Sequence, residues 1–319
     1  MKQIQNLPVS CLMSYREIEE QHPVLMVTSA AAWKAVEARL HGLKIATKLE
    51  VSTATTEHWD TLLSSAARSN AEVVYAVGGG LAADAGKYLA AELNLPLTVL
   101  PTALSVDAFL TATSGVRCEG CVAYIETKVP EVVILDLEVI AAAPASIRAA
   151  GITDVMSIAT GSWDWKFAHE HGQNLPGMEF IPWVYENAQT ILDGVLDCAV
   201  AAGRGDREGL KTLYDCLAME VQLCNQVGHA RPEEGSEHYF AYCAENLVGP
   251  GWPHGDLVGP GIMLMAAMQG QATERYESAL QACHIPLDRI PTAVTEETLA
   301  ALPTYCRKHN LPFGIAHVL

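Results

Sequence analysis

The fold class is indicated by residues 72–87, which read EVVYAVGGGLAADAGK. The apolar run 72–77 predicts a buried strand, and a helix is expected over 82–93, with three consecutive glycines between them. Further apolar runs predict strands at 23–29, 43–51, 97–100 and 132–135, and helices are expected over 30–41 and 56–69. Strands that alternate with helices, and that are apolar throughout, are typical of a mostly parallel sheet covered on both faces.

The pattern changes near residue 145. Beyond it the strand signals stop, and we expect successive helices over 149–168, 182–202, 207–227, 237–245, 257–271 and 296–309. We therefore predict two domains: an α/β Rossmann-like domain over residues 1–145 and an all-α domain over residues 146–319. A ligand is expected in the cleft between two such domains.

Composition excludes several classes of function. The 319 residues include 20 Lys and Arg against 37 Asp and Glu, a net charge of −17. This charge argues against nucleic-acid binding and against docking on anionic lipid. The chain shows neither a membrane-spanning apolar run nor a secretory signal, so we expect no membrane partner.

Cysteine usage indicates the compartment. Nine cysteines, mostly in apolar stretches, fit buried thiols in a reducing cytoplasm. Cys118 and Cys121 form the one CxxC pair, and no second such pair accompanies it. We therefore favour two cysteines that share no metal or redox role.

Apolar helices in the second half favour a homo-oligomer.

The glycine turn could bind a phosphate. Gly78, Gly79 and Gly80 lie between a strand and a helix, where free N–H groups and the helix dipole favour a pyrophosphate. A tight turn without a ligand is the alternative, since the stretch matches neither common phosphate-binding pattern. Asp84 and Lys87 follow at helical spacing, so a local ion pair competes with any role at a ligand.

The next strand ends at a second polar segment, residues 101–107, PTALSVD. Ligands bind at this edge of an open α/β sheet. Thr102 and Ser105 could donate to phosphate or ribose oxygens, and Asp107 could accept from a sugar hydroxyl. Ordinary turn chemistry explains these residues equally well.

A dispersed set in the second half could bind a metal. Asp154, His238 and His254 each lie near an expected helix start. One carboxylate and two imidazoles suit a catalytic divalent ion, either zinc or ferrous iron. Histidines that only donate hydrogen bonds are the competing interpretation.

Five segments in this order resemble the metal-dependent polyol dehydrogenase superfamily. They are GGGLAADAGK, PTALSVDAF, AAGITDVMS, RPEEGSEH and HGDLVGPG, between residues 78 and 261. That superfamily includes glycerol dehydrogenase, iron-containing alcohol dehydrogenases, glycerol-1-phosphate dehydrogenase and, more remotely, dehydroquinate synthase. The chain is most similar to the glycerol-1-phosphate dehydrogenase family, which typically shows an SRPxSGxEH-like segment where this chain has residues 229–238.

The resemblance implies a dehydroquinate synthase-like fold and a metal-dependent oxidoreductase that uses NAD or NADP. Its substrate would be a small polyol or polyol phosphate, above all glycerol 1-phosphate and dihydroxyacetone phosphate. The resemblance also assigns roles: cofactor contacts to Gly78, Gly79, Gly80, Asp84, Lys87, Thr102 and Ser105; a place near substrate and nicotinamide to Asp107; and metal ligation by zinc or iron to Asp154, His238 and His254.

One departure from the family pattern bears on the substrate. Glu233 and Glu234 replace small neutral residues beside Arg231, and two carboxylates would oppose an incoming phosphate unless they point away or pair with Arg231. An unphosphorylated polyol is therefore one alternative. A dehydroquinate synthase-like elimination and a non-catalytic nucleotide- or polyol-binding relative are the others.

Overall fold

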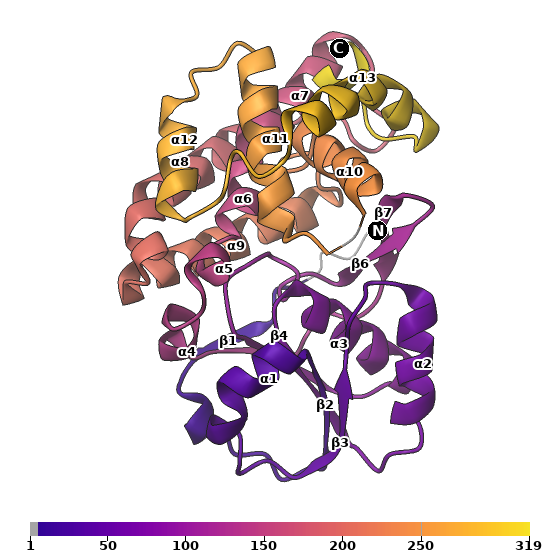
Figure 1. The fold of residues 1–319 in the computed structure, drawn as a ribbon, viewed down its shortest axis with the longest axis vertical. Coiled ribbons are helices and arrows are strands. Elements are labelled where there is room, and N and C mark those ends of the chain that lie inside the picture. The colour runs from indigo at the N-terminus through magenta and orange to yellow at the C-terminus, as the bar shows by residue number, and fades with distance from the viewer. Residues whose placement is uncertain (1–5, 250) are drawn as a thin grey trace. The chain divides into compact units, whose positions relative to one another are not determined.

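The computed structural model describes residues 6–249 and 251–319. They divide into two compact units, residues 6–144 and residues 145–319 (Figure 1). Across the described ranges, no helix combines the length and the apolar character needed to cross a bilayer. The expected cytoplasmic location and homo-oligomer stay predictions.

The first unit is built on a parallel sheet. Its described residues form six strands in the order β1-β8-β5-β4-β2-β3, and every neighbouring pair is parallel. Their bounds are β1 Val9–Leu12, β2 Val24–Thr28, β3 Ile45–Glu50, β4 Val73–Gly78, β5 Leu97–Pro101 and β8 Val132–Leu135. The central strands β2, β4 and β5 are buried along their whole length, as expected for apolar strands covered on both faces.

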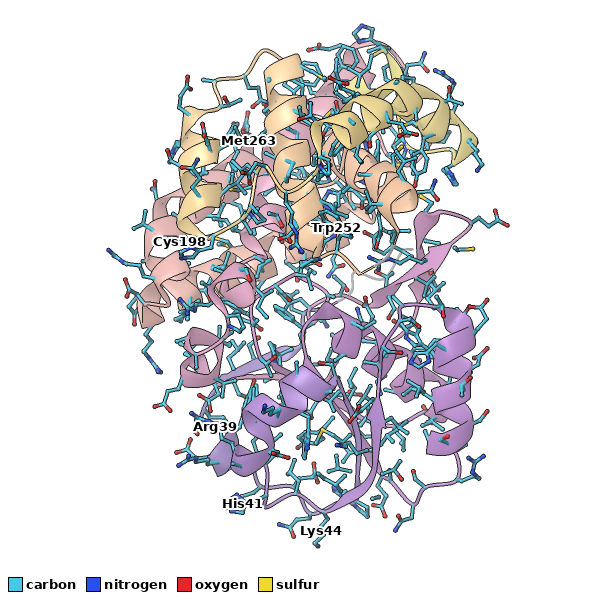
Figure 2. The ribbon with its side chains drawn as sticks, viewed as in Figure 1. Arg39, His41, Lys44, Cys198, Trp252 and Met263 are labelled. Carbon is cyan, nitrogen blue, oxygen red and sulfur yellow. The ribbon has the colours of Figure 1, made fainter. Side chains whose placement is uncertain are left out.

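Helices connect these strands, and a hairpin interrupts the alternation. The helices are α1 Ala30–Val36, α2 Thr56–Ala66, α3 Gly80–Leu93 and α4 Leu137–Ala141, with 3₁₀ turns at Tyr15–Glu17 and Glu37–Arg39. Arg39, labelled in Figure 2, forms an ion pair with the buried Asp136 that caps α4. The antiparallel hairpin joins β6 Thr113–Cys118 to β7 Cys121–Glu126, and the sequence analysis did not predict it.

Among its described residues, the second unit contains helices joined by loops and no strand. Its elements are α5 Ala145–Arg148, α6 Ile152–Met156, α7 Ile158–Glu170, α8 Pro182–Arg204, α9 Arg207–Val227, α10 Ser236–Val248, α11 His254–Met268, α12 Glu274–Ala282, α13 Thr292–Lys308 and the 3₁₀ turn η3 Ile315–His317. Helix α8 packs along α9, and α10 packs against α11 and α13. The single helix expected over 149–168 is divided at Ser157 into α6 and α7. The predicted fold class, a parallel α/β part and a helical part, is confirmed.

Candidate functional site

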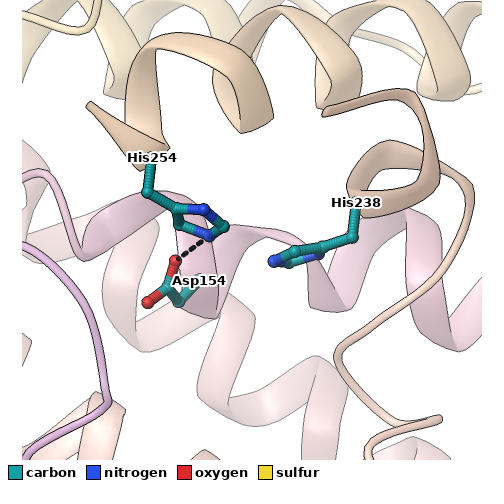
Figure 3. A group of neighbouring side chains, drawn as sticks. All are labelled: Asp154, His238 and His254. Carbon is teal, nitrogen blue, oxygen red and sulfur yellow. Dashed lines mark ion pairs between the residues drawn. The ribbon is translucent and has the colours of Figure 1, made fainter. Parts of the chain in front are cut away.

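Three side chains from three helices converge in the second unit. Asp154 lies in α6, His238 near the start of α10, and His254 at the first residue of α11. One ligand atom from each lies within 4.8 Å of the others. His254 Nε2 is 3.4 Å from Asp154 Oδ1, and the two imidazole centroids are 5.2 Å apart (Figure 3). The structure thus brings together the three residues that the sequence predicts as metal ligands.

The spacing of these atoms fits a shared divalent ion. Zinc bonds to histidine nitrogen or carboxylate oxygen at about 2.0–2.2 Å, so two ligands at a tetrahedral angle lie about 3.4 Å apart. The Asp154–His254 pair shows this separation. Asp154 and His238 are also buried, at 8% and 6% exposed, which limits competition from water for the ion. The donor set suits zinc or ferrous iron.

Glycine and proline place the two histidines at helix starts. Gly235 precedes α10, and a Cβ there would lie 2.7 Å from the Cα of Gly161, so only glycine lets the two backbones approach. Pro253 precedes α11 with an extended backbone, which orients the first helical residue, His254. The side chains therefore leave two helix ends that tertiary packing holds together.

A buried carboxylate, Glu237, holds the ring of His238. Glu237 Oε1 lies 3.0 Å from His238 Nδ1 and accepts the backbone N–H of Gly235 at 2.7 Å, while Oε2 accepts the hydroxyl of Thr160 at 2.6 Å. With Nδ1 engaged, Nε2 is the atom of His238 that could bind a metal ion. Burial lowers the pKa of His238, but the bond from Glu237 and the charges of Glu234, Glu237 and Asp154 outweigh it and raise the pKa to about 9.

A second buried carboxylate, Asp164, fixes the start of α10. Its Oδ2 accepts the backbone N–H of Ser236 at 2.8 Å and also the hydroxyl of Ser236. Its Oδ1 accepts the N–H of Ile315 at 2.8 Å and the amide of Gln269 at 3.2 Å. Burial raises the pKa of Asp164 to about 6, against the opposing charge of Arg231. Asp164 therefore ties the helix that bears His238 to residues near the C-terminus.

In the first unit, the glycine turn lies against the segment that follows β5. The carbonyl of Gly78 accepts the N–H of Thr102 at 3.0 Å, and a Cβ on Gly79 would lie 2.9 Å from the hydroxyl oxygen of Ser105. A Cβ on Gly80 would lie 2.6 Å from a methyl of Val106. The predicted contacts Gly78, Gly79, Gly80, Thr102 and Ser105 thus share one edge of the sheet, at the carboxyl ends of β4 and β5.

Lys87 and Asp84 stabilise the segment that follows β5. Lys87 is fully buried, and its ammonium donates to Ala108 O at 2.7 Å, to Thr111 Oγ1 at 2.9 Å and to the carbonyl of Thr113. It also pairs with Asp84 at 2.9 Å. Burial raises the pKa of Asp84, and Lys87 opposes that rise. The geometry favours the ion pair considered in the sequence analysis, so any role of Lys87 at a cofactor is to shape the turn.

Asp107 lies on the same segment, two residues after Ser105. It is half-buried, and its carbonyl accepts the N–H of Leu110 at 2.7 Å, which closes a turn. The structure thus places it beside the predicted cofactor contacts within the first unit.

At the segment that departs from the family pattern, Arg231 and Glu234 form hydrogen bonds within the second unit. Arg231 is 3% exposed and donates to Phe313 O at 2.8 Å and to the Tyr239 hydroxyl at 3.3 Å. Glu234 accepts the hydroxyl of Tyr242 at 3.0 Å. The Arg231 guanidinium therefore links the C-terminal segment to α10.

The sequence analysis missed Glu237, Thr160 and Asp164. The only sequence signal for Glu237 is its position beside His238. Thr160 and Asp164 lie more than 70 positions away from their partners in α10, and only the packing of α7 on α10 reveals them.

Comparison with known proteins gives consistent matches. Residues 10–144 match a family model described as iron-containing alcohol dehydrogenase. The glycerol-1-phosphate dehydrogenase [NAD(P)+] of Sulfurisphaera tokodaii is 28% identical over 251 residues, which are 79% of this chain and 71% of the relative. The enzyme of the same name from Aeropyrum pernix is 29% identical over 258 residues, covering 80% and 71%.

A solved structure matches over almost the whole chain. The sulfoacetaldehyde reductase of Bifidobacterium kashiwanohense, in complex with NAD+, superposes with a TM-score of 0.71 at 19% identity, and the match covers 99% of this chain and 96% of that one. At this identity the likeness shows that the fold is shared.

Proposed function

We propose that the chain is a member of the iron-containing alcohol dehydrogenase superfamily and, on that premise, a metal-dependent, NAD(P)-linked dehydrogenase of a small polyol or polyol phosphate. The observation that carries the proposal is the convergence of Asp154, His238 and His254. Relatives named glycerol-1-phosphate dehydrogenase [NAD(P)+] make glycerol 1-phosphate and dihydroxyacetone phosphate the first substrates to test.

In this proposal the second unit holds the metal and the substrate. Asp154, His238 and His254 would bind one zinc or ferrous ion, which when bound would supply Lewis acidity to the substrate oxygen. Glu237 keeps the Nδ1 side of His238 engaged so that Nε2 faces the other two ligands. Asp164 keeps the start of α10 in place. These residues pre-organise the site before substrate binds.

The first unit would bind the dinucleotide. Gly79 precedes α3, whose first turn presents backbone N–H groups at the positive end of the helix dipole, the arrangement that favours a pyrophosphate. The lack of a Cβ at Gly79 and Gly80 lets the turn pack against Ser105 and Val106, and Thr102 and Ser105 supply hydroxyl donors beside the turn. Asp107, on the same segment, is the residue we assign to the reacting end of the nicotinamide and to proton transfer.

A second candidate substrate class is an unphosphorylated polyol. Arg231, the cation nearest in sequence to His238, is buried and already bonded to Phe313 and Tyr239. The charge of Glu234 also acts on His238. A phosphate near this segment would be repelled by the carboxylate of Glu234, while the Arg231 guanidinium is already bonded to other groups.

Steady-state assays of the metal-loaded protein test both classes. NADH or NADPH oxidation is followed at 340 nm with dihydroxyacetone phosphate and with dihydroxyacetone, after loading with zinc or ferrous iron. We expect turnover that is lost in His254→Ala and Asp154→Asn. Preference for the phosphorylated ketone supports the first substrate class, and preference for dihydroxyacetone supports the second.

The other outcomes decide against the proposal. Full activity of a metal-free His254→Ala protein would remove the metal from the mechanism. Bound metal and nucleotide without turnover on any polyol would favour a non-catalytic relative. Product formation without net change at 340 nm would favour a dehydroquinate synthase-like reaction.

A further inference from the structure

The hairpin of the first unit places two cysteines opposite each other. Cys118 is the last residue of β6, Cys121 is the first of β7, and the two are register partners. The turn between them has only two residues, Glu119 and Gly120, with φ of 52° and 78°. Positive φ at both turn positions is the conformation of the tight hairpin turn that matches the twist of its strands. The CxxC pair is therefore the closing pair of a well-formed hairpin.

The geometry of a closing pair suits a disulfide. Residues directly opposite in an antiparallel ladder have Cα atoms about 4.5–5.5 Å apart and side chains on the same face. Disulfide-bonded cysteines have Cα atoms about 4.4–6.8 Å apart. Cys118 and Cys121 thus need no change of register or backbone path to bond.

The pair is also accessible. Cys118 is exposed and Cys121 is partly exposed. Of the other seven cysteines, Cys11 and Cys224 are partly exposed, and five are buried: Cys198, Cys216, Cys243, Cys283 and Cys306. Burial raises the pKa of Cys198 and Cys283 to about 12 and that of Cys216 to about 11, which keeps these thiols protonated. Since the thiolate is the reacting form, the buried set is protected from exchange.

Strand β6 is anchored at both ends, and the cysteines lie at the tip of the hairpin. The N–H of Arg117 donates to Ala54 O at 2.8 Å, and the hydroxyl of Ser114 donates to Asp84 O at 3.0 Å. These bonds hold β6 against α3 and against the segment before α2. A disulfide at the tip would lie outside both of these contacts.

We propose that Cys118 and Cys121 are a reversible dithiol–disulfide pair that reacts with low-molecular-weight disulfides. A thiolate of the pair attacks one sulfur of the small disulfide and forms a mixed disulfide with it. The S–S bond of the small disulfide breaks, and its other sulfur leaves as a thiolate and takes up a proton. The second cysteine of the pair then attacks the protein sulfur of that mixed disulfide and releases the second small thiol. In sum, the pair is oxidised by two electrons and the small disulfide is reduced to two thiols.

A metal role explains the pair less well. Two thiolates fill half of a structural zinc site, which needs four ligands. Among the described residues, the one group of three or more metal-ligating side chains is Asp154, His238 and His254 in the second unit. An accessible disulfide that closes a very short loop is expected to be labile and readily reduced, as regulatory disulfides are.

Oxidised glutathione is the probe that tests the proposal. The native full-length protein is incubated with it, the remaining thiols are alkylated, and the masses of the tryptic peptides are measured by mass spectrometry. Cleavage after Arg117 and Lys128 gives the peptide CEGCVAYIETK, which contains both cysteines and no other. We expect this peptide to become two hydrogen atoms lighter than its reduced form, without alkylation, and to recover its thiols with dithiothreitol.

Single variants separate the two steps. Cys118→Ser and Cys121→Ser lack the resolving thiol, so they should stop at a stable glutathione adduct on the remaining cysteine. Cys11→Ser, which removes a partly exposed cysteine elsewhere in the unit, should behave as the wild type. The proposal is overturned if the wild-type peptide stays fully reduced, if it ends as a stable glutathione adduct, or if a disulfide forms first among the other seven cysteines.

Discussion

Replacing Glu237 by glutamine should weaken metal binding while leaving the fold intact. Glutamine has the same shape, and its amide oxygen can still accept the N–H groups of Gly235 and His238. Its amide nitrogen can donate to the hydroxyl of Thr160, which is able to accept. The substitution therefore removes the negative charge from the Nδ1 side of His238 and leaves no buried polar group unpaired.

The expected loss follows from the contacts of Glu237. It is fully buried, so its charge acts on His238 at 3.0 Å with little screening by solvent. Carboxylates in this position behind a metal-ligating histidine typically contribute about 10- to 100-fold to metal affinity. We expect a loss in that range, about 1.4–2.8 kcal/mol. Glu237→Ala should lose more and also lower stability, because it strands the donors of Gly235, Thr160 and His238.

Two readouts check this prediction without any assay of turnover. Zinc affinity is measured by competition with a chromophoric chelator, and Co²⁺ absorption in the visible range reports the ligand geometry. Glu234→Gln is the matched control, because Glu234 also places a charge near His238 but accepts its hydrogen bond from Tyr242. The reasoning fails if Glu237→Gln binds zinc like the wild type, or if Glu234→Gln is impaired as strongly. Failure of the wild type itself to bind zinc or Co²⁺ would instead refute the metal centre.

Three further predictions concern the two units. Zinc at 100 times its Kd should stabilise the second unit by about 2.7 kcal/mol, a rise in Tm of about 5–10 °C, and calorimetry should show no such rise for Asp154→Asn. Gly79→Val should lower NADH affinity by about tenfold or more in a fluorescence titration, since a Cβ would lie 2.9 Å from Ser105 Oγ; unchanged affinity would contradict the assigned turn. Because the pKa of Asp164 is raised from 3.8 to about 6, the stability linked to its protonation is fully present below about pH 4 and is lost, by about 3 kcal/mol, as the pH rises through about 6. Urea titrations should show that the free energy of unfolding depends less on pH in Asp164→Asn. An equal pH dependence in both proteins would refute this.

The sheet and the glycine turn were predictable because their signals are local. Strand β4 is a continuous apolar run that ends at three glycines, and that pattern needs no knowledge of the rest of the chain. Strand β1 was missed because its four residues, VSCL, lie at the sheet edge and are mostly exposed, so they lack an apolar pattern. The hairpin was missed because β6 contains several polar residues and a glycine, and its Ser114 and Gly115 are buried by packing on α3.

The proposed metal ligands were predictable as residue types, and their surroundings were not. Asp154, His238 and His254 were selected by family resemblance and by donor chemistry, both present in the sequence. The contact of Glu237 with Thr160 joins residues 77 positions apart, and that of Asp164 with Ile315 spans 151. Such pairs depend on how α7, α10 and the C-terminal segment pack, which neither periodicity nor composition encodes.

The clamp at Asp164 has a consequence for biosynthesis. Ile315 and Ala316 donate to Asp164 and to the Ser236 hydroxyl, and a Cβ at Gly314 would collide with the same carboxylate. The start of α10 is thus completed by residues translated almost 80 codons after it. On the ribosome the start of α10 would lack these bonds until residues 314–316 leave the exit tunnel, so a nascent chain should bind the ion more weakly before that point. A fusion tag placed directly after residue 316 should hinder the formation of these bonds.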